Sequence, residues 1–128
     1  MRLITGRRQL LELLSRISLE KAEIPINTKT LQALFKDAKS AMLYDHLCDI
    51  STMRLWLAVC LQLYIARQQG PPKSIYLRIL SATDVPESQL DMLGEITQCI
   101  SGEIEYRYAY DLREDIPVGT YRLTLLVS

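Results

Sequence analysis

The sequence predicts an α+β protein with an N-terminal three-helix lobe around a central apolar helix, followed by a β-α-β-β sheet. Apolar residues of the first half recur at helical spacing, whereas those of the second half alternate in the manner of strands. The change falls at Gly70-Pro71-Pro72, where a glycine and two prolines end a helix. A length of 128 residues suits one domain, 1–128, with a helical lobe over 1–69 and a sheet lobe over 73–128.

The first two helices are amphipathic. The first is predicted over Gly6–Ile17, and a connector that contains Pro25 follows it. The second is predicted over Thr28–Leu47, with Asn27 or Thr28 as its cap. Their apolar faces consist of Leu10, Leu13, Leu14 and Ile17 in the first helix, and of Leu31, Leu34, Phe35, Ala38, Met42 and Leu43 in the second.

The third helix, predicted over Ser51–Gln69, is apolar on every side. Its residues from Leu55 to Ala66 are apolar except for Gln62. A helix of this kind is normally surrounded by other elements, so we expect it at the centre of the molecule. The apolar run is shorter than the roughly 20 residues that span a bilayer, and no membrane association is expected.

The second half begins with a strand over Ser74–Ser81 that is apolar on both faces, which favours an interior position in the sheet. A helix opens at Pro86 and ends at Gly102. Two further strands, Glu103–Asp111 and Thr120–Val127, alternate clearly and are expected to form an antiparallel hairpin.

Four tyrosines on the last two strands are the candidate partner-binding residues. They are Tyr106, Tyr108, Tyr110 and Tyr121. Burying each large ring contributes about 1.5–3 kcal/mol at most. We therefore expect the four rings to be at least partly covered. The helices of the fold, a protein partner or stacked RNA bases could each cover the rings. The acidic balance of the second half disfavours RNA.

Charge is balanced in total but uneven along the chain. Fifteen basic residues match fifteen acidic ones. Residues 1–69 hold ten basic and six acidic residues, a net of +4, and residues 70–128 hold five and nine, a net of −4. The alternative to protein binding is therefore a nucleic-acid contact by the helical lobe. Its candidate residues are Arg7, Arg8, Arg16, Lys36 and Lys39.

Residues capable of catalysis are few. His46 is the single histidine, and Cys48, Cys60 and Cys99 form no C-x-x-C pair. His46 could meet Cys60 or Cys99 only through the fold. With no metal-ligand spacing and no phosphate-binding glycine loop, we expect no catalytic residues, metal or cofactor. The odd cysteine count and the charged N-terminal segment favour a cytoplasmic location.

The sequence thus predicts a non-catalytic protein–protein interaction module, of adaptor or regulatory type, that binds another protein or itself. The expected surfaces are the open edge of the tyrosine hairpin and any exposed side of the third helix. The alternative is a nucleic-acid-binding regulator that uses the basic helical lobe.

Overall fold

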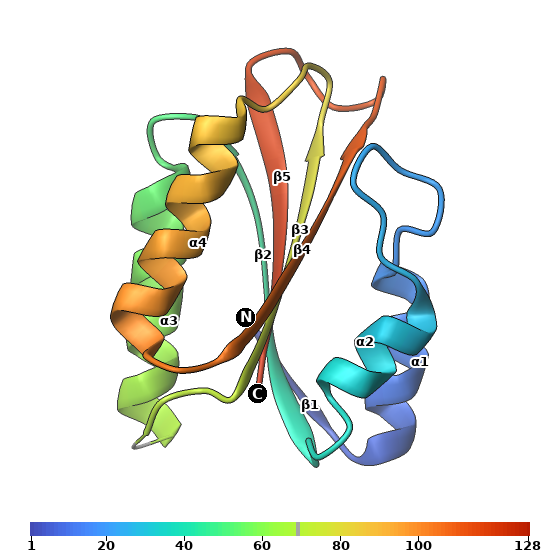
Figure 1. The fold of residues 1–128 in the computed structure, drawn as a ribbon, viewed down its shortest axis with the longest axis vertical. Helices are drawn as coiled ribbons and strands as arrows, with labels where there is room; N and C mark the ends of the chain where they lie inside the picture. The colour runs from blue at the N-terminus through green and yellow to red at the C-terminus, as the bar shows by residue number, and fades with distance from the viewer. Residues whose placement is uncertain (69) are drawn as a thin grey trace.

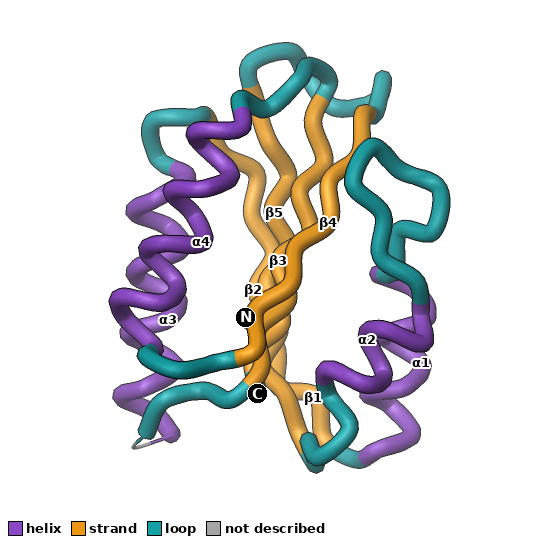
Figure 2. Tube along the Cα trace, in the orientation of Figure 1, coloured by secondary structure: helices purple, strands orange, loops and turns teal. Residues whose placement is uncertain are grey.

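The chain forms three layers, with a five-stranded mixed sheet between two pairs of helices (Figures 1 and 2). This computed structural model describes residues 1–68 and 70–128. The elements are β1 (Arg2–Thr5), α1 (Arg7–Ile17), α2 (Thr28–Leu34), β2 (Ser40–Asp49), α3 (Met53–Gln68), β3 (Ser74–Ser81), α4 (Glu87–Ser101), β4 (Glu105–Leu112) and β5 (Thr120–Val127). The predicted α+β class is confirmed.

The strands are ordered β1-β2-β5-β3-β4. β5 lies antiparallel between β2 and β3, and β4 is parallel to β3. The predicted hairpin of the last two strands is therefore wrong, because β5 pairs with β2 and β3 and not with its neighbour in the chain. In that position β5 is covered on both faces, and Leu123, Leu125 and Leu126 are fully buried.

The predicted N-terminal three-helix lobe, set apart from a β-α-β-β sheet, is also wrong. The chain begins with β1, and β2 occupies the second half of the helix expected over Thr28–Leu47. α2 begins where Asn27 Oδ1 accepts from the Thr30 amide at 2.8 Å, and it ends at Leu34. Beyond it, eight residues of β2 pair with β5, and this ladder outweighs the helical spacing of the apolar residues.

The apolar helix α3 lies on one face of the sheet and not at the centre of the molecule. It packs with α4 on that face, while α1 and α2 cover the opposite one (Figure 1). Its predicted last residue, Gln69, lies outside the described residues. Within the described ranges, none of the helices combines the length and the apolar character that crossing a bilayer requires.

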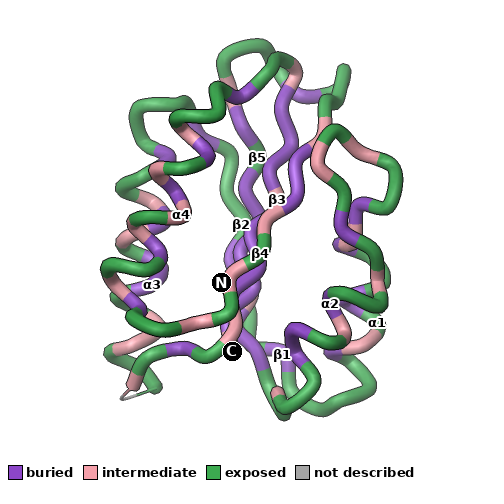
Figure 3. Tube along the Cα trace, in the orientation of Figure 1, coloured by how far each residue is buried: buried purple, intermediate pink, exposed green. Residues whose placement is uncertain are grey.

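Each face of the sheet has its own apolar core (Figure 3). On the α3 and α4 side the fully buried members include Leu57, Leu61, Ile75, Leu77, Ile79, Leu93, Leu123 and Leu125. On the α1 and α2 side they include Leu10, Leu14, Leu31, Tyr76, Ala109 and Leu126. Tyr76 extends through this second core, and its hydroxyl donates to the Ile17 carbonyl at 2.8 Å.

Candidate functional site

An apolar stripe runs along the outer side of α3, and we call it the α3 stripe. It consists of Leu55, Val59 and Leu63, which are 66%, 43% and 45% exposed. Residues four apart share one face of a helix, so the three side chains form a continuous row. The opposite side of α3 buries Met53, Leu57, Cys60 and Leu61 against the sheet. The fold therefore accounts for only one side of this helix.

A groove separates α3 from α4 beside the stripe. Its volume is about 540 Å³, and its lining is mainly apolar. The lining residues are Ser51, Arg54, Leu55, Ala58, Glu95, Ile96, Cys99 and Ile100. Leu55 belongs to both the stripe and the groove, so the two features form one surface, the α3–α4 face.

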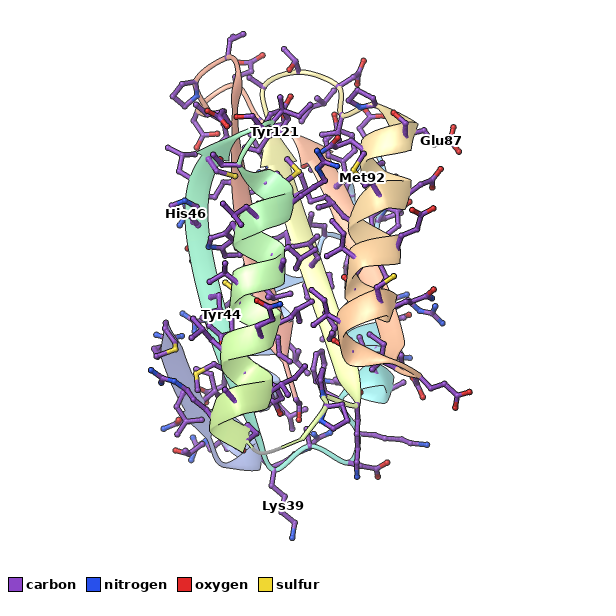
Figure 4. The ribbon with its side chains drawn as sticks, turned by 90° about the vertical axis from the view of Figure 1, so that its left-hand side faces the viewer. Lys39, Tyr44, His46, Glu87, Met92 and Tyr121 are labelled. Carbon is purple, nitrogen blue, oxygen red and sulfur yellow. The ribbon has the colours of Figure 1, made fainter. Side chains whose placement is uncertain are left out.

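The two helices of this face carry opposite charge. The charged residues of α3 are Arg54 and Arg67, whereas those of α4 are Glu87, Asp91 and Glu95. The guanidinium of Arg54 donates to the Met92 sulfur at 2.8 Å, which puts it level with the acidic residues along the helix axes. Both helices run in the same direction (Figure 4).

The start of α3 is fixed by Asp49. Its Oδ1 accepts hydrogen bonds from the Ser51 hydroxyl at 2.7 Å and the Thr52 amide at 3.0 Å. These bonds lower the pKa of Asp49. The ring of His46 on β2 stacks on Trp56 of α3 with centroids 5.8 Å apart, so the two rings form a contact between the strand and the helix.

The cysteines lie in two environments. Cys48 and Cys60 are buried and Cys99 is exposed on α4. Burial raises the pKa of Cys48, and it raises that of the Cys60 thiol to about 11, which makes Cys60 a packing residue with little thiolate at neutral pH. Among the described residues, no group of three or more His, Cys, Asp or Glu side chains could hold a metal.

The predicted partner-binding tyrosines lie on the α3 and α4 side of the sheet. Tyr110 and Tyr121 are buried, and Tyr106 and Tyr108 are half-buried with their rings stacked at 6.1 Å. The Tyr110 hydroxyl donates to the Thr83 carbonyl and accepts from the Val85 amide, both at 3.1 Å. The fold thus covers most of the stripe, and Tyr106 and Tyr108 keep partial exposure.

The outer edge of β4 is partly occupied by the chain itself. The amide of Ile24 donates to the Tyr110 carbonyl at 2.9 Å, and the Tyr110 amide donates to the Ile24 carbonyl at 3.0 Å. The connector between α1 and α2 therefore covers this edge at Tyr110, where the sequence predicts an open edge.

The basic residues predicted to contact nucleic acid are spread over the α1 and α2 layer. Arg7 donates to the carbonyls of Phe35 and Ala38, and Arg8 pairs with Glu12 at 3.5 Å. Lys36 and Lys39 are exposed in the segment between α2 and β2. Arg16, in the last turn of α1, lines a pocket on the sheet. The structure therefore brings Arg7 next to the segment that carries Lys36 and Lys39, whereas Arg16 lies at the other end of α1.

The protein is thus a three-layer α/β/α protein with a mixed sheet, and one of its helices, α3, is incompletely covered. No family model matches the sequence, and no curated protein is significantly similar to it. The fold is similar to part of FtsZ from M. jannaschii. A point mutant of FtsZ has a TM-score of 0.60 at 10% identity, over 85% of this chain and 33% of FtsZ. An empty FtsZ dimer has a TM-score of 0.55 at 12% identity, over 84% and 32%. This chain spans about a third of FtsZ, and the similarity concerns the fold alone.

Proposed function

We propose that the protein is a self-associating interaction module, and that two copies meet through their α3–α4 faces. The observation that carries the proposal is the α3 stripe, because three large apolar side chains in a row lie exposed beside an apolar groove. Contiguous exposed apolar surface of this kind is typical of interaction sites. The stripe of one copy fills the groove of the other.

The opposite charges of α3 and α4 favour a second copy of this chain as the partner that binds the α3–α4 face. A two-fold axis parallel to the helices sets α3 of one copy over α4 of its partner. Arg54 then lies at the level of the partner's acidic α4 residues, because within its own chain it is level with Met92, next to Asp91. Each charge contact occurs twice in such a self-complementary dimer. A two-fold axis across the helices would instead set α3 on α3 and bring arginines near arginines.

The size of the face sets the strength of the contact that it can make. α3 has 16 residues and is therefore about 24 Å long. Neighbouring helices lie about 10 Å apart, so the two together present roughly 24 by 20 Å. Such a face has an area of about 480 Å² per partner, which corresponds to a small, weak and concentration-dependent contact below the standard ~800 Å².

Sedimentation analysis over a range of concentrations tests the proposal. The wild-type chain is expected to dimerise, and Val59→Asp is expected to remain monomeric while keeping its fold by circular dichroism. Val118→Asp is the matched control, because Val118 is 80% exposed in the segment between β4 and β5, away from this face. A wild-type chain that stays monomeric at millimolar concentration would disprove the proposal.

Charge reversal tests the arrangement within the dimer. Arg54→Glu is expected to weaken dimerisation, and adding Glu95→Lys is expected to restore much of it. A double variant that is weaker than either single variant would show that the two helices do not face each other across the dimer axis. Dimers that persist in Val59→Asp and weaken in Tyr106→Ala would instead place the contact at the tyrosines of β4.

A further inference from the structure

A row of polar side chains crosses the face of the sheet that α1 and α2 cover. Asp45 on β2 is paired in register with Thr124 on β5, and Thr124 is paired with Arg78 on β3. The Thr124 hydroxyl accepts from Arg78 Nη2 at 3.0 Å and lies 3.5 Å from Asp45 Oδ1. The rows on one side of it hold Ala41, Tyr76 and Leu126, which are buried core residues. On the other side of the row, Arg122 is paired in register with Leu47 and Leu80, and Asp45, Leu47 and Arg122 are exposed. The row therefore lies at the border of this core, and only Thr124 and Arg78 are drawn into it.

Arg78 is the costly member of this row. Its guanidinium is largely withdrawn from water, and burial lowers its pKa. Its Nε atom is buried and has no hydrogen-bond partner in the described part of the chain. An unpartnered buried donor of a charged group costs stability, so such groups are normally paired.

Asp45 does not neutralise Arg78. It forms an ion pair with Arg122, whose Nη2 lies 3.0 Å from Asp45 Oδ2 and whose Nε lies 3.4 Å from Oδ1. The bidentate contact engages both oxygens of Asp45. Asp45 also attracts Arg78 at longer range across Thr124, but one carboxylate shared by Arg78 and Arg122 leaves this group of three with one net positive charge.

A pocket of about 430 Å³ opens between this row and the C-terminal half of α1. Arg78 lines it together with Arg2 of β1 and Arg16 of α1, and among the described residues none of these three arginines has a carboxylate within ion-pair distance. The apolar part of the lining consists of Met1, Leu13, Ile17 and Leu43. Asp45 and Thr124 complete the lining. The pocket thus combines three guanidinium groups with an apolar wall and one carboxylate, and that carboxylate is already paired with Arg122.

We propose that this pocket binds a small organic phosphate, with Arg2, Arg16 and Arg78 around the phosphate group and the organic part against Leu13, Ile17 and Leu43. Guanidinium groups match the geometry of phosphate oxygens and form charge-assisted hydrogen bonds with them. Three arginines exceed the single lining carboxylate, Asp45, by two charges, and this excess suits a phosphate dianion better than a carboxylate ligand. The site lies on the opposite side of the sheet from the α3–α4 face, so it is independent of dimerisation.

Phenyl phosphate is a suitable probe, because it carries both the dianion and an apolar ring. We expect saturable binding by isothermal titration calorimetry, weaker binding of inorganic phosphate, and no binding of uncharged benzyl alcohol. The substitution Arg16→Gln is expected to weaken binding about tenfold, the effect of losing one charged hydrogen bond. Arg2→Gln is a second variant at the same pocket.

Arg8→Gln is the matched control. Arg8 and Arg16 are both exposed residues of α1, but Arg8 lies outside the pocket and pairs with Glu12. Gln and Arg have similar helix propensity, so both variants should fold equally well. We expect the Arg8→Gln variant to bind like the wild type within twofold. Absence of saturable binding up to about 10 mM, or an equal loss in the two α1 variants, would overturn the proposal.

Discussion

α1 and α3 lie on opposite faces of the same sheet and differ in how completely the fold uses them. In α1 the buried residues Leu10, Leu13, Leu14 and Ile17 form one stripe, and nearly all other positions are polar. In α3 a buried stripe of equal size is matched by an exposed apolar one. The apolar side of α1 is covered by its own chain, whereas α3 has a second apolar side that its own chain leaves exposed.

The difference shows that an apolar side chain in a helix is not always buried by its own chain. α3 is the more apolar of the two helices, yet α1 is the one whose apolar residues are all used inside the chain. A helix between two strands packs one side on the sheet, and an apolar outer side points to a second contact.

Thiol labelling compares the inner side of α3 with the outside of its neighbour α4. Cys99 is exposed in the monomer and lines the groove of the α3–α4 face, whereas Cys60 is buried. In protein dilute enough to be monomeric we therefore expect labelling of Cys99 at least about a thousandfold faster, since Cys60 reacts only when the protein opens. Mass spectrometry of partly labelled protein shows the order in which the cysteines react. Equal rates at Cys60 and Cys99 would show that α3 is not packed as described.

The raised pKa of Cys60 also makes stability depend on pH. The folded state holds the thiol protonated to about pH 11, whereas the unfolded chain releases the proton near pH 9. This contribution to stability is complete below pH 9 and is lost as the pH rises toward 11. A Cys60→Ala variant should lose less stability than the wild type over that interval in urea titrations.

Leu14→Ala in α1 and Leu57→Ala in α3 compare the two cores. Both side chains are fully buried, so each substitution removes packed methyl groups and leaves a cavity. We expect each to lower the free energy of unfolding by about 3 kcal/mol in chemical denaturation. A change below 1 kcal/mol at Leu57 would mean that the sheet-facing side of α3 is poorly packed.

Asn27→Ala tests how firmly the α1 and α2 layer is held. Loss of the side-chain cap on the Thr30 amide is expected to cost about 1 kcal/mol of unfolding free energy. Asn27→Asp keeps the acceptor oxygen and serves as the control. If both variants are equally destabilised, the capping oxygen is not what stabilises α2.

Leu63→Gln gives the smallest change in stability and the sharpest contrast with Leu57. Because Leu63 is exposed, its substitution should change the unfolding free energy of the monomer by less than about 0.5 kcal/mol. The same substitution should weaken dimerisation measurably in sedimentation. A large loss of monomer stability would contradict the assignment of Leu63 to the outer side.

Much of the local structure could be predicted from the sequence. The strand expected over Ser74–Ser81 is β3, and the alternating segments near Tyr106 and Leu123 are β4 and β5. The helices expected around Leu13 and Leu57 are α1 and α3. In these segments the apolar period and the end signals agree, so local pattern and tertiary packing favour the same structure.

β2 could not be predicted because its pattern satisfies two periods at once. Met42 and Leu43 continue the helical spacing of Leu31 and Leu34, yet Met42, Tyr44 and Cys48 also share one face of a strand. Pairing with β5, far away in the chain, decides between them. The same pairing removes the hairpin expected between β4 and β5.

The candidate sites were only partly visible. The sequence predicts a third helix that is apolar on all sides, but only the fold shows that Leu55, Val59 and Leu63 lie on its outer side. Arg78, a single charge in a strand expected to be interior, was the available signal for the pocket. Its meeting with Arg2 and Arg16 depends on contacts between distant segments, which no local pattern reveals.

The place of β5 has a consequence for how the molecule is made. β2 and β3 are not neighbours in the sheet, and the strand that lies between them consists of residues 120–127. While the ribosome is still adding residues before 120, β2 and β3 have no strand between them, and the backbone N–H and C=O groups that later pair with β5 have no partner in the sheet. The sheet can therefore be completed only when β5 inserts between β2 and β3. Until then the unpaired strand edges make the growing chain prone to aggregate with other copies.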